Sequence, residues 1–261
     1  MSTWINGKAI AMAVAIMAAG WSVSASEGEV HKIAPDAALQ QLKDGNARFI
    51  AGKSTHPNAD AARIIQADKE DQGKYAFATI LSCSDSRVPV ELIFDTGIMD
   101  IFVVRDAGNI SGPDATASIE YGICHVHTPV LVILGHSRCG AVTTVTKVVN
   151  GKIIKLEKNI PPLVNNIVPA VKRAQANHSD VHGDALIPYA TEENVWLTIE
   201  DLLLKSPATR EMVKSGKLKI AGAVYDLATG KVNWLPEDKV AAILKNVEKN
   251  PKKVEGIFAE K

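Results

Sequence analysis

The sequence predicts an α/β fold in which helices flank a mostly parallel central sheet, with an N-terminal helical arm and a late edge strand. The apolar residues form four near-continuous runs that do not alternate with polar residues, as expected of parallel strands covered on both faces. Helical patterns lie between these runs, an order that is typical of a single α/β domain. The runs are residues 75–82, 101–104, 130–134 and 218–224.

The chain before the first run has the pattern of helices. Residues 35–53 have apolar side chains at near-helical spacing, and Asp36 can cap the helix that they predict. A second helix is expected at about 60–67. Neither helix is long enough to bury a core alone, so residues 26–74 are predicted to form an arm that lies over the main body or over a partner subunit.

The remaining residues, 75–261, are predicted to form the α/β body of the same domain. A turn is expected at 226–231, and 232–235 can return from it as an edge strand. Helices are predicted at 113–125, from Cys139 or Gly140 onward, at 163–175, at 192–204 and at 236–244.

The first 25 residues have the pattern of a secretory signal peptide. Lys8 is their only formally charged side chain, an apolar run at 9–19 follows it, and residues 23–25 are small, as signal peptidase requires. The run is short for a membrane span, which favours cleavage over anchoring. We therefore expect cleavage near Ala25, a mature domain of residues 26–261 without a stable membrane span, and a periplasmic location.

The overall charge gives no reason to expect a nucleic-acid partner. The chain has 29 basic and 29 acidic residues, so it has no excess of positive charge with which to bind phosphate groups. Its apolar fraction of 46% is ordinary for a globular protein with a sizeable core.

Two short motifs each follow an apolar run directly. They are Cys83-Ser84-Asp85-Ser86-Arg87 and His136-Ser137-Arg138-Cys139-Gly140. Because the carboxyl ends of parallel strands meet at one edge of a sheet, Cys83, His136 and Cys139 are expected to converge there. Two thiolates and an imidazole favour zinc over magnesium, calcium or manganese, and three such ligands leave one tetrahedral position free for catalysis. The sequence thus predicts one zinc ion per subunit, with activated water as the nucleophile.

Asp85 and Arg87 are the second feature of the first motif. Arg87 can hold Asp85 by two hydrogen bonds so that the carboxylate accepts a proton from zinc-bound water. Alternatively, Asp85 can move onto the zinc as a fourth ligand and close the site. Both states are compatible with the sequence.

The cysteine count is odd for an exported protein, in which disulfides usually pair cysteines. If Cys83 and Cys139 bind a metal, only Cys124 remains, and its apolar, helical setting predicts a small buried hydrophobic residue. The alternative is a disulfide between Cys83 and Cys139.

At these two motifs the sequence resembles the β-class carbonic anhydrases, whose Cys-X-Asp-Ser-Arg and His-X-X-Cys-Gly patterns it matches. The likeness covers about residues 36–245 and includes 102–105, 107–109, 118–121 and 225–230. The resemblance implies reversible hydration of carbon dioxide to bicarbonate and a proton by attack of zinc-bound hydroxide. It further implies that Cys83, His136 and Cys139 hold the zinc and that Asp85 and Arg87 are catalytic. It also implies a homodimer, in some members paired into a tetramer, with active-site clefts at the subunit interface.

The resemblance also assigns a pocket for carbon dioxide. Its residues would be Val88, Phe102, Gly108 and Tyr121, which together give an apolar slot with one hydroxyl group. Val88 and Phe102 can equally well be ordinary core residues.

The sequence departs from the family pattern at two positions. Some members build a regulatory bicarbonate pocket on a Trp three residues before the first Cys; here that residue is Ile80, so we expect an open site near neutral pH. Others carry a Gln nine residues before the Cys, where this chain has Lys74, with Gln72 nearby. His125 and His127 are candidates for carrying the proton from the site to buffer. Their positions are equally compatible with ordinary surface residues.

Two other functions remain open at this point. Relatives with the same fold and ligands hydrolyse carbon disulfide or carbonyl sulfide. A non-catalytic zinc protein or bicarbonate sensor is a further alternative, although such a protein would have no need for Asp85 and Arg87.

Overall fold

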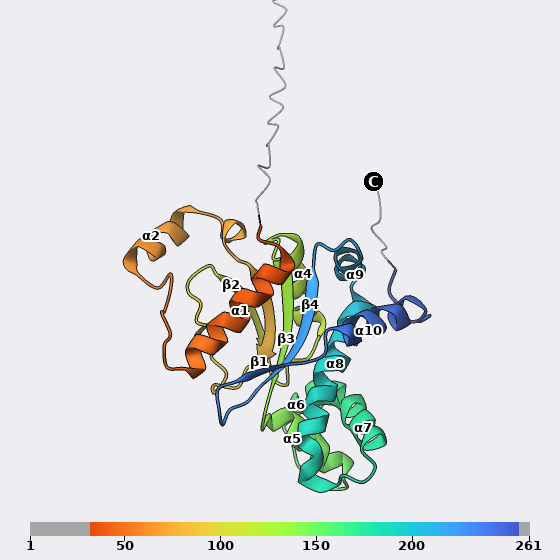
Figure 1. Cartoon of the computed structure of the whole chain (residues 1–261). Coiled ribbons are helices and arrows are strands. Elements are labelled where there is room, and N and C mark those ends of the chain that lie inside the picture. Colours follow the sequence, from red (N-terminus) through yellow and green to blue (C-terminus); the bar gives the residue numbers. More distant parts are fainter. Residues whose placement is uncertain (1–31, 256–261) are drawn as a thin grey trace, which may run out of the picture. The chain divides into compact units, whose positions relative to one another are not determined.

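A five-stranded sheet forms the centre of the computed structural model, which describes residues 32–255 (Figure 1). The predicted signal peptide, residues 1–25, lies outside the described residues. The strands lie in the order β2-β1-β3-β4-β5. They are β1 (Ala78–Cys83), β2 (Ile101–Asp106), β3 (Val130–His136), β4 (Lys219–Tyr225) and β5 (Val232–Trp234).

The pairing of the strands confirms the predicted fold class. Strands β1 to β4 pair in parallel, and β5 runs antiparallel to β4 at one edge of the sheet. Every residue of β1 and β3 is buried, which explains why their sequences are continuous apolar runs without alternation. The edge strand β2 is only partly buried.

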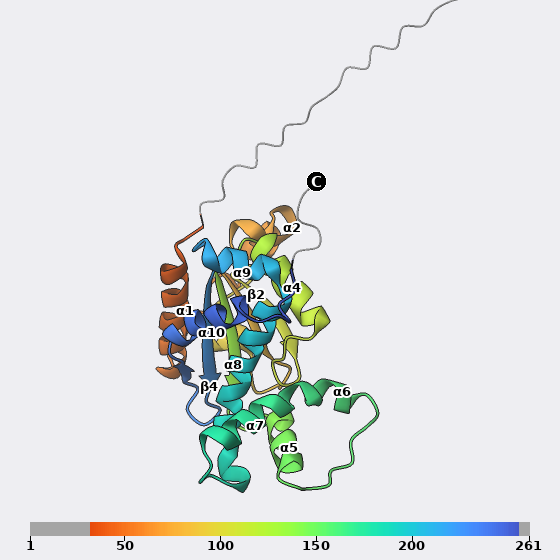
Figure 2. The same cartoon turned by 90° about the vertical axis from the view of Figure 1, so that its right-hand side faces the viewer.

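Helices cover both faces of the sheet, and Figure 2 shows α1 on one side and α4 on the other. The α-helices are α1 (Pro35–Ile50), α2 (Ala61–Lys69), α3 (Val90–Ile93), α4 (Pro113–Cys124), α5 (Gly140–Val149), α6 (Ile160–Val164), α7 (Val168–Asn177), α8 (Ile187–Lys205), α9 (Pro207–Lys214) and α10 (Asp238–Glu248). Short 3₁₀ helices lie at η1 (Gln72–Lys74), η2 (Asn165–Ile167) and η3 (Gly183–Leu186). None of the helices within residues 32–255 is long and apolar enough to cross a membrane.

Within residues 32–255, three buried clusters make up the core. On one face of the sheet, Leu39 and Leu42 of α1 pack with Ile80 and with inward residues of β3 and β4. On the other face, α4, α8, α9 and α10 pack around residues such as Leu131. The third cluster lies beyond the carboxyl ends of the strands, among α5, α7 and the η2 and η3 turns, and it includes Cys83 and Cys139. The two cysteines of the predicted site are therefore part of the core.

The predicted cap of the first helix is wrong. Asp36 lies in the first turn of α1, and its carboxylate accepts a hydrogen bond of 2.6 Å from Nζ of Lys219. The residue before the helix is Ala34, which has no capping side chain. Because Lys219 is distant in the sequence, no local pattern could indicate this pairing.

Helix α1 is fixed to the body by Asn46, which is buried. Its Nδ2 donates to the carbonyl oxygens of Ile93 and Gly230, and its Oδ1 accepts from the backbone N–H of Val232. Next to it, a Cβ atom on Gly45 would lie 1.9 Å from the carbonyl oxygen of Phe94, so only glycine allows this close approach. Helix α1 thus packs on the body of its own chain.

Asp95 links α1 and the following loop to the body. Its buried carboxylate accepts hydrogen bonds from Nε of Arg48 at 2.6 Å and from the backbone N–H groups of Thr55 and His56 at 2.9 Å each. Burial by itself would raise the pKa of Asp95, but these donors more than offset it and hold the pKa well below its usual range. The ionised carboxylate therefore stabilises the folded state.

We expect Asp95→Asn to lower the free energy of unfolding by about 2 kcal/mol at pH 7, because it removes a buried charged acceptor. Since the folded-state pKa is depressed, the contribution of the carboxylate is complete above the unfolded-state pKa of about 4 and is lost as the pH falls through the folded-state pKa. Urea unfolding curves should show the difference from wild type narrowing below about pH 4. The exposed Asp44→Asn on α1 is the control, expected within about 0.5 kcal/mol of wild type. Equal stability of the two variants at pH 7 would contradict the prediction.

Candidate metal centre

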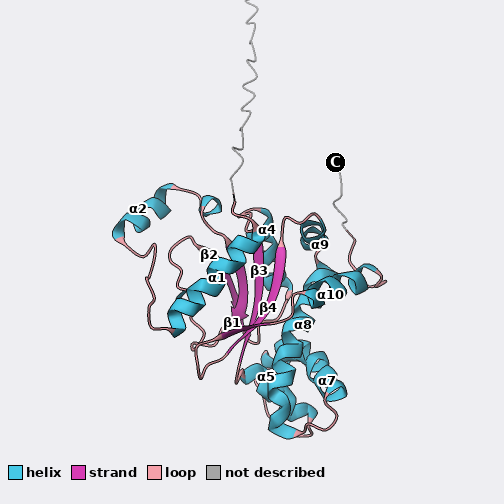
Figure 3. Ribbon diagram, viewed as in Figure 1, coloured by secondary structure: helices cyan, strands magenta, loops and turns pink. Residues whose placement is uncertain are grey.

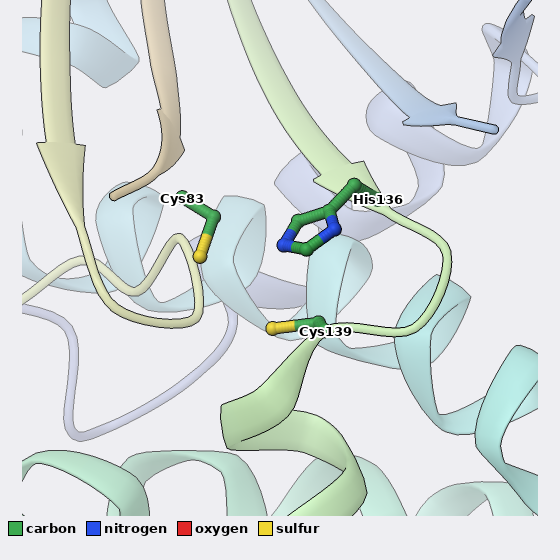
Figure 4. Close-up of side chains that lie close together, drawn as sticks. All are labelled: Cys83, His136 and Cys139. Carbon is green, nitrogen blue, oxygen red and sulfur yellow. The ribbon is translucent and has the colours of Figure 1, made fainter. Parts of the chain in front are cut away.

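Cys83, His136 and Cys139 converge at the carboxyl edge of the sheet. Cys83 is the last residue of β1, His136 is the last residue of β3, and Cys139 directly precedes α5. One ligand atom from each residue lies within 4.8 Å of the other two, and all three residues are buried. Figure 4 shows the two sulfur atoms and the imidazole ring turned toward one another. The predicted convergence of the two motifs is therefore observed.

The imidazole of His136 is prepared to be a ligand. Its Nδ1 lies 3.0 Å from the carbonyl oxygen of Ser137, which can only accept a hydrogen bond, so Nδ1 carries the proton. The other nitrogen, Nε2, is buried and has no hydrogen-bond partner. A buried acceptor of this kind is costly unless it binds something, and a metal-binding imidazole is usually oriented by a bond of this type.

The thiols of Cys83 and Cys139 affect each other's pKa. Because Cys139 donates a hydrogen bond to Cys83, the pKa of Cys83 falls to about 4, and the pKa of Cys139 is raised for the same reason. Ionising both would put two negative charges side by side, which a divalent cation would offset. A donor set of two sulfurs and one imidazole nitrogen fits zinc.

All three cysteines are free thiols in the structure, so the alternative disulfide between Cys83 and Cys139 is not present. Cys124 is half-buried, and its sulfur lies 3.8 Å from that of Met212. Burial raises the pKa of the Cys124 thiol. Its surroundings are apolar, as predicted, although its burial is incomplete.

Asp85 and Arg87 form a two-pronged ion pair beside the cluster. Nε and Nη2 of Arg87 donate to Oδ1 and Oδ2 of Asp85 at 2.9 and 2.7 Å, and the backbone N–H of Arg87 adds a third bond to Oδ1. Hydrogen bonding to Arg87 holds the pKa of Asp85 well below its usual range. Oδ2 of Asp85 also lies 4.0 Å from Nε2 of His136. The carboxylate is therefore ionised, held by Arg87, and next to the cluster.

Arg105 supports the loop that carries Asp85. From the neighbouring strand β2, its Nε donates to the carbonyl oxygen of Cys83 at 3.0 Å, and its Nη2 donates to that of Asp85 at 2.7 Å. The two sequence motifs do not include Arg105 and predict no role for it. Its position directly after the apolar run 101–104, at the same sheet edge as Cys83, was the signal that could have identified it.

The second loop is held from β4. The backbone N–H of Ser137 donates to the carbonyl oxygen of Tyr225, and Oγ of Ser137 donates to the carboxylate of Asp226 at 3.3 Å. Arg87 joins the two loops, because its Nη2 also donates to the carbonyl oxygen of Arg138 at 3.2 Å. Contacts from β2 and β4, and the bond between the two loops, thus fix the loops that follow β1 and β3, strands that lie side by side in the sheet (Figure 3).

A family model described as carbonic anhydrase matches residues 78–232 of this chain, which include the whole cluster. The solved structure of the β-carbonic anhydrase CcaA is 27% identical, and the alignment covers 75% of this chain and 86% of that one with a TM-score of 0.58. The chain belongs to the β-class carbonic anhydrases.

Curated relatives agree with this assignment. Carbonic anhydrase 2 of Mycobacterium tuberculosis is 33% identical over 199 residues, which are 76% of this chain and 91% of the relative. A carbonic anhydrase of Mycolicibacterium smegmatis is also 33% identical over 199 residues and is covered to 92%. The structure of the β-carbonic anhydrase CafA of Aspergillus fumigatus, 23% identical with a TM-score of 0.60 over 81% of this chain and 97% of that one, shares the fold.

The pocket residues that the β-class carbonic anhydrase pattern assigns fall into two groups. Gly108 lies at the cluster, and its backbone N–H donates to Sγ of Cys83 at 3.3 Å. Val88 follows the Asp85 loop and is fully buried in the core beneath α1. Phe102 pairs with Thr79 of β1, which is four residues before Cys83. Phe102 is therefore about 13 Å from Cys83 along the strand direction. Tyr121 of α4 is exposed beside Phe102, with ring centroids 6.0 Å apart.

The other residues singled out from the family pattern also lie away from the cluster in this chain. Ile80 is fully buried beneath α1. Gln72 and Lys74 lie in η1, before the amino end of β1. The exposed His125 and His127 precede β3, and the His125 ring stacks on Tyr121 at 5.3 Å. Within one chain, the predicted pocket residues Phe102 and Tyr121 thus lie toward the amino ends of the strands, near His125 and away from the cluster.

Proposed function

We propose that this chain catalyses the reversible hydration of carbon dioxide to bicarbonate and a proton. The observation that carries the proposal is the buried cluster of Cys83, His136 and Cys139 with the ionised carboxylate of Asp85 4.0 Å from the imidazole. Zinc held by these three side chains supplies, when bound, the Lewis acidity that makes hydroxide available at neutral pH. One zinc ion per subunit is expected, since residues 32–255 contain one such cluster.

Asp85 and Arg87 act on the attacking water. Arg87 donates to both oxygens of Asp85, and Nη2 takes one lone pair of Oδ2. Because a carboxylate oxygen has two lone pairs, Oδ2 can still accept a hydrogen bond from that water. The water is thereby oriented toward carbon dioxide, and its proton is drawn toward Oδ2. Because the Asp85 side chain is 18% exposed, the proton can pass on to solvent.

We propose that the resting site is open. Asp85 is paired with Arg87 in the structure, and Ile80 stands at the position where some relatives have the Trp of a regulatory bicarbonate pocket. A crystal structure at neutral pH with Asp85 bound to the zinc would contradict this part of the proposal.

We further propose that the active unit is a homodimer, or a tetramer built from two dimers. Phe102, Tyr121 and Gln72 cannot reach the cluster of their own chain, but a partner subunit could bring them to it. Two features support such a contact. The edge strand β2 has three partly buried apolar residues and no partner on its outer side among the described residues. On α2, Ile64 and Ile65 are 58% and 56% exposed.

If α2 lies at the dimer interface, negative charges introduced on it should separate the subunits. Ile64→Glu combined with Ile65→Glu should shift the protein from dimer to monomer in sedimentation velocity and reduce its hydration activity. The control is Ile153→Glu, which makes the same change at a fully exposed position in the loop after α5 and should leave the mass unchanged. A wild-type protein that is an active monomer would contradict the proposal.

We also propose that the chain is exported and that residues 1–25 are removed, which leaves one domain in the periplasm. The support is the sequence pattern alone: the charged Lys8, the apolar run 9–19 and the small residues before the expected cleavage at Ala25. Mass spectrometry of the protein from a periplasmic extract tests this, since the mature chain should begin at Ser26.

Carbon dioxide is proposed over carbon disulfide and carbonyl sulfide on the strength of the family assignment. The test is to offer all three to metal-quantified protein, following proton release by stopped flow and hydrogen sulfide release separately. We expect fast hydration of carbon dioxide and little sulfide. Sulfide release without carbon dioxide hydration would identify the chain as a hydrolase of carbon disulfide or carbonyl sulfide. No turnover of any substrate by zinc-loaded protein would favour a non-catalytic zinc protein or sensor.

A further inference from the structure

A backbone hydrogen bond reaches one of the metal-binding sulfurs from the loop between β2 and α4. The donor is the N–H of Gly108, 3.3 Å from Sγ of Cys83. Hydrogen bonds to a ligand sulfur reduce the negative charge that it donates to a metal, so they tune the metal centre without touching the ion. What holds Gly108 in place therefore affects the metal.

Two side chains of α8 hold this loop. Nδ2 of Asn194 donates to the carbonyl oxygen of Gly108 at 2.8 Å, and Oγ1 of Thr198 donates to that of Asn109 at 3.1 Å. Asn194 and Thr198 are four residues apart and lie on one face of the helix, one turn from each other. They are 1% and 2% exposed. Two successive turns of α8 thus bind the carbonyl groups of two successive loop residues, Gly108 and Asn109.

The stability of the core does not explain this polar pair. The neighbouring Val195 and Ile199 belong to the apolar core on the α8 side of the sheet. Oδ1 of Asn194 is buried and has no hydrogen-bond partner. Burying an amide with only one of its two groups paired costs free energy, so an apolar residue would be favoured here if packing were the only requirement.

The loop has little freedom to move on its other side. Gly108 has a φ of +87°, and a Cβ atom there would lie 2.8 Å from Cδ1 of Ile167 and 3.2 Å from Cβ of Ala141. Side chains of the η2 turn and α5 therefore pack closely against Gly108. The N–H groups of Asn109 and Ile110 bond to Asp106 at the start of the loop, and the bonds from α8 fix the carbonyl groups of Gly108 and Asn109. Together these bonds restrict the orientation of the peptide that carries the Gly108 N–H.

We propose that Asn194 and Thr198 are positioning residues of the metal centre: they orient the 107–110 loop so that Gly108 donates its hydrogen bond to the Cys83 sulfur. They act through the loop and do not contact the metal or the substrate. The proposal rests on the zinc site of the proposed function. Its consequence is that a change on α8 alters the electronic properties of a ligand that α8 does not touch.

The test is the absorption spectrum of the full-length protein with cobalt(II) in place of zinc. Asn194→Leu combined with Thr198→Val removes both donors and keeps the number and branching of the side-chain heavy atoms. Without the N–H bond the filled sulfur orbital rises in energy, so the sulfur-to-cobalt charge-transfer band should move to longer wavelength. Zinc affinity, measured by competition with a chromophoric chelator, should fall by about tenfold or more.

Matched variants separate this effect from general destabilisation. Thr191→Val makes the same change at a residue of α8 that is equally buried, but its hydroxyl donates to Ile187 within the helix. It should leave the band and the affinity as in wild type, and Thr198→Ser, which keeps the hydroxyl, should do the same.

A folded double variant with the wild-type band and affinity would overturn the proposal. If the double variant does not fold, Thr198→Val alone decides: a smaller shift in the same direction supports the proposal, and no shift overturns it. Wild-type protein without a sulfur-to-cobalt band would refute the metal site itself. Failure to hydrate carbon dioxide with a normal band would refute the proposed activity and leave this inference standing.

Discussion

Cys139→Ser is expected to abolish zinc binding and, with it, carbon dioxide hydration. A serine hydroxyl stays protonated at neutral pH and is a poor ligand for zinc, so the site keeps only one thiolate and the imidazole of His136. Loss of a residue that merely supports a ligand lowers metal affinity about 10-fold to 100-fold, and loss of a ligand should cost more. The measurements are zinc per chain by mass spectrometry after dialysis and hydration rate by stopped flow.

Cys124→Ser is the matched control for this variant. It makes the same change at a half-buried cysteine that packs on Met212, outside the cluster. We expect it to keep one zinc ion per chain and wild-type activity. If Cys139→Ser also retained zinc and activity after dialysis, the assignment of the three ligands would be wrong.

Asp85→Asn is expected to lower kcat/KM for hydration by about 10²-fold to 10⁴-fold, the range that a positioned proton acceptor contributes. Asparagine has nearly the same shape as aspartate, but its amide cannot accept a proton, and it loses one of the two charged bonds to Arg87. Zinc should remain bound, because Asp85 is not among the three cluster residues. The effect should therefore be on turnover and not on metal content.

The control for Asp85→Asn is Asp238→Asn, which removes the same charge at an exposed position in the first turn of α10. Its activity should equal that of wild type. An Asp85→Asn protein with full zinc and full activity would show that this carboxylate takes no part in the reaction. A variant that lost its zinc would instead point to Asp85 as a ligand and to a closed resting site.

The sequence was sufficient to predict the sheet and the cluster because both depend on local signals. Continuous apolar runs mark the strands, and the ligand residues Cys83 and His136 are the last residues of β1 and β3. Because parallel strands end at one edge, convergence of Cys83 and His136 follows from topology alone. The short spacing from His136 to Cys139 then places the third ligand with the others.

What supports the cluster could not be predicted, because each supporting contact joins distant parts of the chain. Arg105 reaches the Asp85 loop from β2, Asp226 holds Ser137 from the end of β4, and Asn194 binds Gly108 from α8. A polar residue on a mostly apolar helix has no local sign of its partner. The wrong cap at Asp36 has the same cause, since the pairing with Lys219 spans most of the chain.

Some misses were of a different kind. Helix α9 was not predicted, although Ser206 caps it through a bond from the N–H of Thr209 and Pro207 begins it. A Ser followed by Pro is a local start signal for a helix, so α9 could have been predicted from the sequence. The predicted helix at 163–175 is instead α6, η2 and α7, because the chain tightens into a 3₁₀ turn at Asn165–Ile167.

The most direct test of the central claim is the hydration rate as a function of bound zinc in one preparation. The protein is stripped with a chelator under reducing conditions, zinc is returned in measured steps, and carbon dioxide hydration is followed by stopped flow at each step. We predict no catalysis by the metal-free protein and a linear rise that ends at one zinc ion per chain. Hydration that persists without metal, or its absence at full zinc occupancy, would contradict the account.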